Sequence, residues 1–245
     1  MATNWNYRIR RTHRYLGVLL GIQFFLWTVG GLYFSWSNMD EIHGDFQKKP
    51  PPQYRTDLAF VSPSVVLQNL KATLKMDSML NIALIDVLGK PTYRLEFLHG
   101  GHHKMYQLAD AQTGVLRDPL SIEEATALAK QQYNGEPKVK SVELLKEVNG
   151  HHEYRENPLP ALAVTFEKPM STTVYIALEM GVVTKYRNDK WRIFDFLYML
   201  HTMDYQTRDN FGNWLLRAFS IFGLVTVLSG FTLYFISSKR FKNYK

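Results

Sequence analysis

The chain has 245 residues, of which 46% are hydrophobic and 21% charged, with a formal charge of +7 and no cysteine. The lack of cysteine excludes disulfides, thiol nucleophiles, covalently attached c-type haem and cysteine-bound iron–sulfur clusters. The mean hydropathy of −0.22 would suit an ordinary soluble domain. That average hides two long apolar runs, one near each end.

The two apolar runs predict transmembrane helices at 15–36 and 212–237. The first run carries no charge, and the second carries only Arg217, one turn after Trp214, where a long side chain can reach the membrane interface. About 20 apolar residues are enough for a helix to cross the hydrocarbon core. The first run is too long for the apolar core of a signal peptide and lacks a small-residue cleavage site after it, so we expect an uncleaved anchor.

Basic residues flank both predicted spans and indicate their orientation. They are Arg8, Arg10, Arg11 and Arg14 before the first span and Lys239, Arg240, Lys242 and Lys245 after the second. By the positive-inside rule, both ends are expected in the cytoplasm and the intervening domain in the periplasm of a bacterial inner membrane. The rest of the chain holds 21 basic residues, the remainder of 29, against 22 acidic ones, so the basic charge indicates topology and anionic lipid rather than nucleic acid.

The central region contains an internal repeat. The segment 91–97 resembles 160–166, and in each copy a tyrosine follows the phenylalanine by nine residues and precedes a glycine. Each copy predicts a hairpin of alternating residues after a helical segment, at 64–70 and 125–132. Ser121 and Glu124 form a capping box before the second helix, and Asn149-Gly150 predicts a tight hairpin turn in the second copy.

These patterns predict an α+β membrane protein, in which two transmembrane helices flank a periplasmic domain of two helix-plus-antiparallel-strand repeats. The expected parts are a basic cytoplasmic tail (1–14), the first span (15–36), a proline-containing linker (37–55), the repeat domain (56–190), an interfacial amphipathic helix (191–211), the second span (212–237) and a basic cytoplasmic tail (238–245).

Several motifs carry a resemblance to a known family. They are QLADAQTG at 107–114, HRYLG with a further glycine at 13–21, GGLY at 30–33, LH at 200–201 and SGFTLY at 229–234. The repeats resemble PepSY domains, and the flanking helices resemble PepSY-associated transmembrane helices. Larger members, including bacterial ferrisiderophore reductases, have four spans and bind b-type haems. The resemblance therefore implies haem b, electron transfer and iron, and two spans per chain imply a homodimer.

His13 stands at the start of the first span, and Gly17 and Gly21 follow on the same face. An imidazole there can bind haem iron while the glycines leave room for the flat ring, and Arg11 or Arg14 can pair with the propionates. The alternative is that the glycines pack a partner helix and His13 belongs to the interfacial basic cluster.

Two further histidines are candidate haem or iron ligands on the outer side. His201 ends an aromatic-rich amphipathic segment that places Phe194 and Leu197 on its face, as expected of an interfacial helix. His43 leaves the first span on the same side and can approach His201. The plainer alternatives are an interfacial histidine and a linker histidine.

The other five histidines lie at predicted turns. His99, His102 and His103 occupy a hairpin tip whose counterpart at 167–171 has none, and His151 and His152 occupy another turn. They are either a transient metal site, since imidazole is a common transition-metal ligand, or solvated turn residues.

Two functions remain open. The first is transmembrane electron transfer through haem b to a ferric chelate or ferrisiderophore, fed by a separate donor protein or a quinol because no flavin or nicotinamide fingerprint is present. Since only His13 is expected on the cytoplasmic side, a second ligand there would come from a homodimer or a larger membrane complex. The alternative is a non-catalytic PepSY accessory or binding subunit of an envelope complex without haem. Hydrolysis is disfavoured by the absence of HExxH, GxSxG and cysteine.

Overall fold

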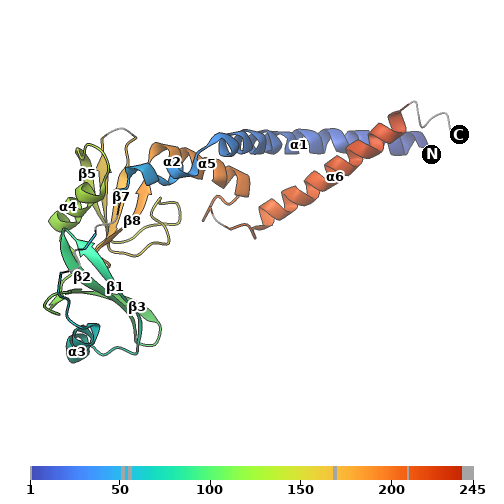
Figure 1. The fold of residues 1–245 in the computed structure, drawn as a ribbon. Helices are drawn as coiled ribbons and strands as arrows, with labels where there is room; N and C mark the ends of the chain where they lie inside the picture. The colour runs from blue at the N-terminus through green and yellow to red at the C-terminus, as the bar shows by residue number, and fades with distance from the viewer. Residues whose placement is uncertain (1, 51–52, 55–56, 168–169, 209, 239–245) are drawn as a thin grey trace. The chain divides into compact units, whose positions relative to one another are not determined.

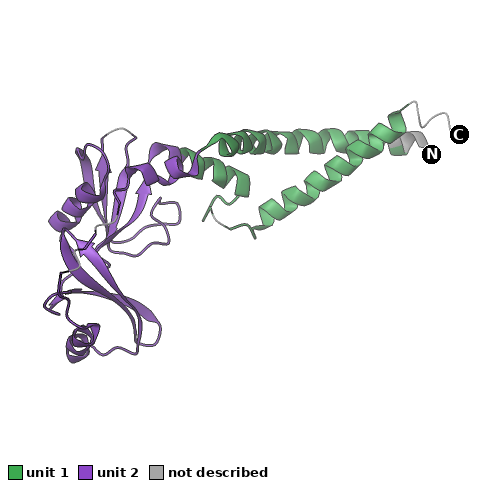
Figure 2. Ribbon diagram, in the orientation of Figure 1, with its two compact units in different colours: residues 1–37, 193–245 green, residues 38–192 purple. Residues whose placement is uncertain are grey.

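The computed structural model describes residues 2–50, 53–54, 57–167, 170–208 and 210–238 (Figure 1). The chain divides into two compact units (Figure 2). The helical unit comprises Met1–Ser37 and Ile193–Lys245, and the sheet unit comprises Asn38–Arg192. The basic residues expected after the second span lie at 239–245, outside the described residues.

The helical unit is built on the two apolar runs. Helices α1 (Ala2–Trp36) and α6 (Trp214–Ser237) cover them, and both are long and apolar enough to cross a membrane. The side chain of Asn213 caps α6 by accepting a hydrogen bond from Leu216 N at 2.8 Å. The guanidinium of Arg217 lies against Gly212, 3.7 Å from its Cβ position, so this side chain reaches back toward the start of the helix, as predicted.

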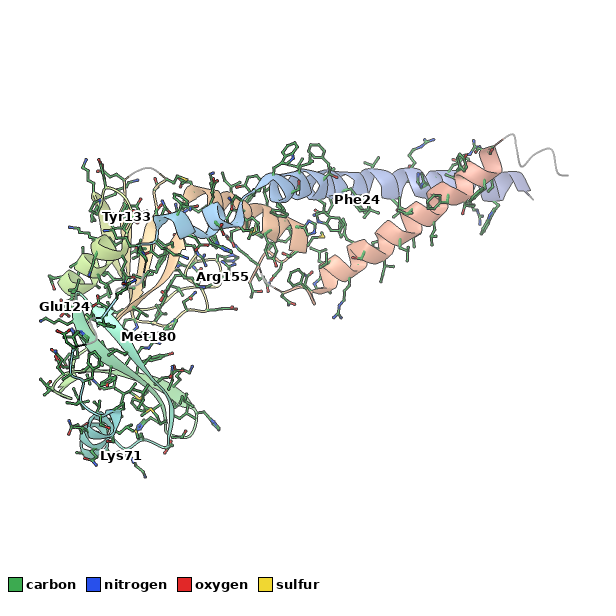
Figure 3. The ribbon with its side chains drawn as sticks, in the orientation of Figure 1. Phe24, Lys71, Glu124, Tyr133, Arg155 and Met180 are labelled. Carbon is green, nitrogen blue, oxygen red and sulfur yellow. The ribbon has the colours of Figure 1, made fainter. Side chains whose placement is uncertain are left out.

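Helices α1 and α6 run antiparallel and pack along a narrow seam. Leu20 of α1 and Thr226 of α6 are buried, and the buried Gln23 of α1 donates a hydrogen bond to the carbonyl of Leu200 in helix α5 (Asp189–Thr202) at 2.8 Å. At Gly223 an added Cβ would lie 3.2 Å from the ring of Phe24, which Figure 3 labels on α1. The small residues of α6 therefore set how closely the two helices approach.

Helix α5 (Asp189–Thr202) leads from the sheet unit into the helical unit. Within the helical unit it packs on α1. The ring of Phe194 is tilted against that of Phe34 with 4.8 Å between the centroids, and Leu197 Cβ lies 4.0 Å from the Cβ position of Gly30. The predicted shared face of Phe194, Leu197 and His201 is confirmed. The helix ends at Thr202, so the expected interfacial segment 191–211 consists of this helix and a non-helical connection.

The sheet unit contains two helix-plus-sheet repeats. The first consists of α3 (Pro63–Thr73), β1 (Ser78–Val87), β2 (Lys90–His99), β3 (His103–Asp110) and β4 (Leu116–Arg117). The second consists of α4 (Ile122–Gln132), β5 (Val139–Leu145), β6 (Ala161–Phe166), β7 (Thr173–Ala177) and β8 (Val182–Arg187). Each sheet is antiparallel with its strands in chain order. The short helices α2 (Met39–His43) and η1 (Asp45–Gln47) precede them.

The predicted repeat corresponds to equivalent positions in the two sheets. The matching segments fall in the second strands, β2 and β6, and the two tyrosines in the third, β3 and β7. Gly114 and Gly181 form the turn after each third strand with φ of 77° and 67°, which favours glycine. The capping box of Ser121 and Glu124 is also present.

Each helix covers one face of its own sheet. In the second repeat Tyr133, next to the end of α4, stacks on Phe166 at 4.3 Å between ring centroids. Leu108 of the first sheet belongs to the same buried cluster as Leu128 of α4, so the two repeats share a hydrophobic core. The sheet unit is therefore one packed body rather than two independent domains.

The prediction of a tight hairpin turn at Asn149-Gly150 is wrong. Strand β5 ends at Leu145 and its antiparallel partner β6 begins only at Ala161, so Asn149-Gly150 lies within a long connection and does not form a tight turn between the two strands. Asn149 instead closes a local turn by accepting a hydrogen bond from His151 N at 2.9 Å. The physical reason is Tyr154, which is fully buried, stacks on Tyr175 at 4.7 Å and holds the connection against the sheet.

Candidate functional site

The seam between α1 and α6 fixes the orientation of His13. Its Nδ1 lies 2.8 Å from Ser229 Oγ, and Ser229 Oγ donates to the carbonyl of Thr226 at 2.7 Å. A serine hydroxyl has one proton, so Ser229 accepts its bond to His13 from Nδ1–H. A neutral His13 then carries its lone pair on Nε2. This is the tautomer that binds a metal through Nε2 while Nδ1–H donates a hydrogen bond to a neighbouring group.

Glycines surround His13 in two different ways. An added Cβ at Gly230 would lie 3.3 Å from His13 Cε1, so glycine at this position lets the imidazole approach α6 closely. The Cβ positions of Gly17 and Gly21 have nothing within 4 Å. These two predicted residues therefore form an open flank of α1 and do not pack against α6. Arg14, at the same end of the helix, is exposed.

His201 lies near a second group of aromatic residues. Its ring centroid is 5.6 Å from that of Trp27 and 6.2 Å from that of Phe34, and the side chain is exposed. Along α1, Trp27 is about 20 Å from His13 at 1.5 Å per residue. His13 and His201 of one chain therefore cannot bind the same ion, and they define two separate positions.

His43 is exposed in α2 of the sheet unit. Its approach to His201 stays a prediction. Within the described part of the chain, no three histidine, aspartate or glutamate side chains are grouped so that they could hold a metal ion. Each of the positions at His13 and His201 thus offers a single imidazole.

The connection 203–213 was not recognised from sequence and holds the end of α5 near the start of α6. Asp204 accepts hydrogen bonds from the backbone of Gln206, Thr207 and Asn210 and from the hydroxyl of Thr207. Burial alone would raise the pKa of Asp204, but these hydrogen bonds outweigh it and lower the pKa to about 2. The loop is therefore ordered around a carboxylate that stays ionised at neutral pH.

The sheet unit ends in a partly buried ion pair that sequence reasoning also missed. Arg192 donates to both carboxylate oxygens of Glu153, at 2.8 and 3.0 Å, and Tyr175 donates its hydroxyl to the same carboxylate at 2.6 Å. Burial lowers the pKa of Arg192, but Glu153 and Asp189 outweigh it and raise the pKa. Burial raises the pKa of Tyr175, and the negative charge of Glu153 raises it further. The residues are far apart in sequence, so only the fold could bring them together.

Two of the other five histidines make local hydrogen bonds. His152 Nδ1 accepts a hydrogen bond from Tyr154 N at 3.0 Å, and its ring meets the edge of Tyr175 at 6.3 Å. His99 Nδ1 lies 2.5 Å from the carbonyl oxygen of Lys75. His102, His103 and His151 are exposed.

Two helices suited to a membrane, joined to a paired helix-plus-sheet unit, define an α+β membrane protein with PepSY-like repeats. The chain belongs to the family described as "PepSY-associated TM region", whose model matches residues 10–245. No curated protein and no solved structure matches the chain. Membership makes it a membrane protein, with α1 and α6 as the elements that meet the lipid bilayer.

Proposed function

We propose that the protein binds haem b in a bacterial inner membrane and passes electrons across it, as a homodimer, from a separate donor or a quinol to a ferric chelate such as a ferrisiderophore. The observation that carries this proposal is the Nδ1 contact of His13 with Ser229, which leaves Nε2 free as an iron ligand. A haem bound there supplies a one-electron iron couple, whose potential depends on its axial ligands and burial.

The residues near His13 suit a flat, acidic ligand. Gly17 and Gly21 leave the adjacent flank of α1 open, and Arg14 presents a guanidinium that can pair with a propionate. One chain contributes one histidine here. A haem held there by two histidines would take the second from His13 of another copy, and such a dimer would also bring together four membrane helices.

His201 provides the second position, with Trp27 and Phe34 as apolar neighbours and His43 as a further candidate ligand. A separation of about 20 Å along α1 suits two positions nearer the two faces of a bilayer whose core is about 30 Å thick. The four arginines before the first span support an orientation with the N-terminus in the cytoplasm and the sheet unit in the periplasm.

The test is a dithionite-reduced minus oxidised spectrum of the protein purified after haem-replete expression. We expect b-type absorbance, which His13→Ala and His201→Ala each reduce. Ser229→Ala, which removes only the support of His13, should lower haem affinity about tenfold. His102→Ala is the matched control and should keep the full spectrum. A wild-type protein without b-type absorbance would contradict the proposal and favour a haem-free accessory or binding subunit of an envelope complex.

The dimer has its own measurement, the mass of the protein in mild detergent by light scattering. A dimeric mass that persists with haem bound is expected. A monomer that retains full haem content would show that His13 of a second chain is not a ligand.

A further inference from the structure

The hairpin between β2 and β3 brings together two histidines that the proposed electron transfer does not use. His99 and His103 face each other as the last pair of the antiparallel ladder. Residues directly opposite in such a ladder have Cβ atoms about 4.5–5.5 Å apart and side chains on the same face. The fold thus places two histidines directly opposite each other at the hairpin tip.

The ring of His99 is oriented by the backbone. Its Nδ1 lies 2.5 Å from the carbonyl oxygen of Lys75. A carbonyl can only accept a hydrogen bond, so Nδ1 carries the proton and the lone pair of the neutral ring is on Nε2. A hydrogen bond from the far ring nitrogen to a backbone carbonyl is also the usual support of a histidine that binds a metal.

The tip itself is held in place. Gly100 and Gly101 have φ of 63° and 88°, which allow the tight reversal, and the Gly101 amide donates to the carboxylate of Asp77 at 2.7 Å. Asp77 therefore brings a negative charge to the tip. The neighbouring Lys104 forms an ion pair with Glu96, which offsets its positive charge.

The equivalent hairpin of the second repeat shows that the fold does not need these histidines. It joins Phe166 of β6 to Thr173 of β7 without a histidine. The pair in the first repeat is therefore an addition to the fold, placed on an accessible tip.

We propose that His99 and His103 form a binding site for a divalent transition-metal ion at the tip of the β2–β3 hairpin. Across the described residues no group of three candidate ligands is present, so the two imidazoles bind the ion with water in the remaining positions. Such a nitrogen site should bind Cu²⁺ more tightly than Ni²⁺ or Zn²⁺.

The test is a Cu²⁺ titration of the full-length protein in detergent, followed by calorimetry and by electron paramagnetic resonance of the bound copper. We expect His99→Gln and His103→Gln each to weaken the tightest site at least tenfold and to remove one nitrogen from its spectrum. The matched control, His151→Gln, lies at an exposed turn of the second repeat and should leave that site unchanged.

Unchanged Cu²⁺ binding in the His99→Gln/His103→Gln double variant would overturn the assignment, as would an equal loss in His151→Gln. The melting temperature of each variant checks that the hairpin still folds. The b-type spectrum should be the same in all of them, so the metal site and the proposed haem function succeed or fail independently.

Discussion

Arg192 neutralises the partly buried carboxylate of Glu153 at the end of the sheet unit. Glu153 is only 19% exposed, and replacing Arg192 by methionine would leave its carboxylate without its bidentate partner. We expect Arg192→Met to lower the free energy of unfolding by about 2 kcal/mol, below the full cost of breaking a buried pair because Arg192 itself is partly exposed. Thermal unfolding followed by tryptophan fluorescence measures this.

The matched control for that change is Lys138→Met. Lys138 pairs with Glu167 at 2.7 Å, but the two side chains are 76% and 39% exposed. Its loss should cost at most about 0.5 kcal/mol. Equal destabilisation by the two variants would mean that the Arg192 network does not act as a partly buried ion pair.

Alanine substitutions at Gly181 and Gly89 distinguish the cost of backbone strain from the cost of steric overlap. Both have positive φ, 67° and 79°, but a Cβ at Gly181 would lie 3.0 Å from Leu108 Cδ1, whereas a Cβ at Gly89 has nothing within 4 Å. Gly89→Ala should therefore cost about 1 kcal/mol, the backbone contribution alone. Gly181→Ala should cost about 2–4 kcal/mol because it also overpacks the shared core. Similar melting temperatures for the two variants would argue against close packing at Gly181.

Among the helices and strands, the sequence predicted the ones that are specified by a local residue pattern. The membrane helices follow from unbroken apolar runs, and the repeats from alternation and from the capping box of Ser121 and Glu124. The prediction of a tight turn at Asn149-Gly150 was wrong because the burial of Tyr154, a tertiary effect, determines the path of the connection between β5 and β6. Local signals fail where packing against a distant strand outweighs turn propensity.

The candidate site shows the same limit. His13 was found from its place before the first span, but its contact with Ser229, 216 residues away, was not predicted. Which residue of α6 meets His13 depends on the register of two antiparallel helices. That register is set by close packing at Gly223 and Gly230, which one sequence does not reveal.

The connection between α5 and α6 makes a prediction about pH. The pKa of Asp204 is about 2 in the folded protein, below the value of about 3.9 in an unfolded chain. The carboxylate therefore stabilises the fold above about pH 4, by about 2–3 kcal/mol, and this contribution is lost as the pH falls through 2. Asp204→Asn should lower the melting temperature at pH 6 and differ progressively less from wild type toward pH 2.

Melting curves between pH 2 and pH 6 check this expectation, with Asp118→Asn as the control. Asp118 is exposed in a loop, so its replacement removes a charge without breaking such a network. A constant difference between Asp204→Asn and wild type over the whole range would contradict the assigned role of the carboxylate.

For the chain as a whole, the distribution of charge and the packing both separate the membrane helices from the sheet unit. The arginines before the first span carry much of the positive excess, and the region outside the two basic ends is close to neutral. The sheet unit buries its apolar side chains in core clusters of its own, whereas α1 and α6 expose large apolar side chains along most of their length. Only the helical unit is therefore suited to the bilayer, and the orientation proposed for it rests on the arginines before the first span.

Single cysteines test that orientation without any background, because the chain contains none. Gln112, exposed in the turn after β3, and Thr12, exposed near the start of α1, report on opposite sides. In intact spheroplasts a membrane-impermeant maleimide should label Gln112→Cys and leave Thr12→Cys unlabelled until detergent opens the membrane. The reverse pattern would place the sheet unit in the cytoplasm. It would also remove the periplasmic acceptor from the proposed electron transfer while leaving the copper site at His99 and His103 untouched.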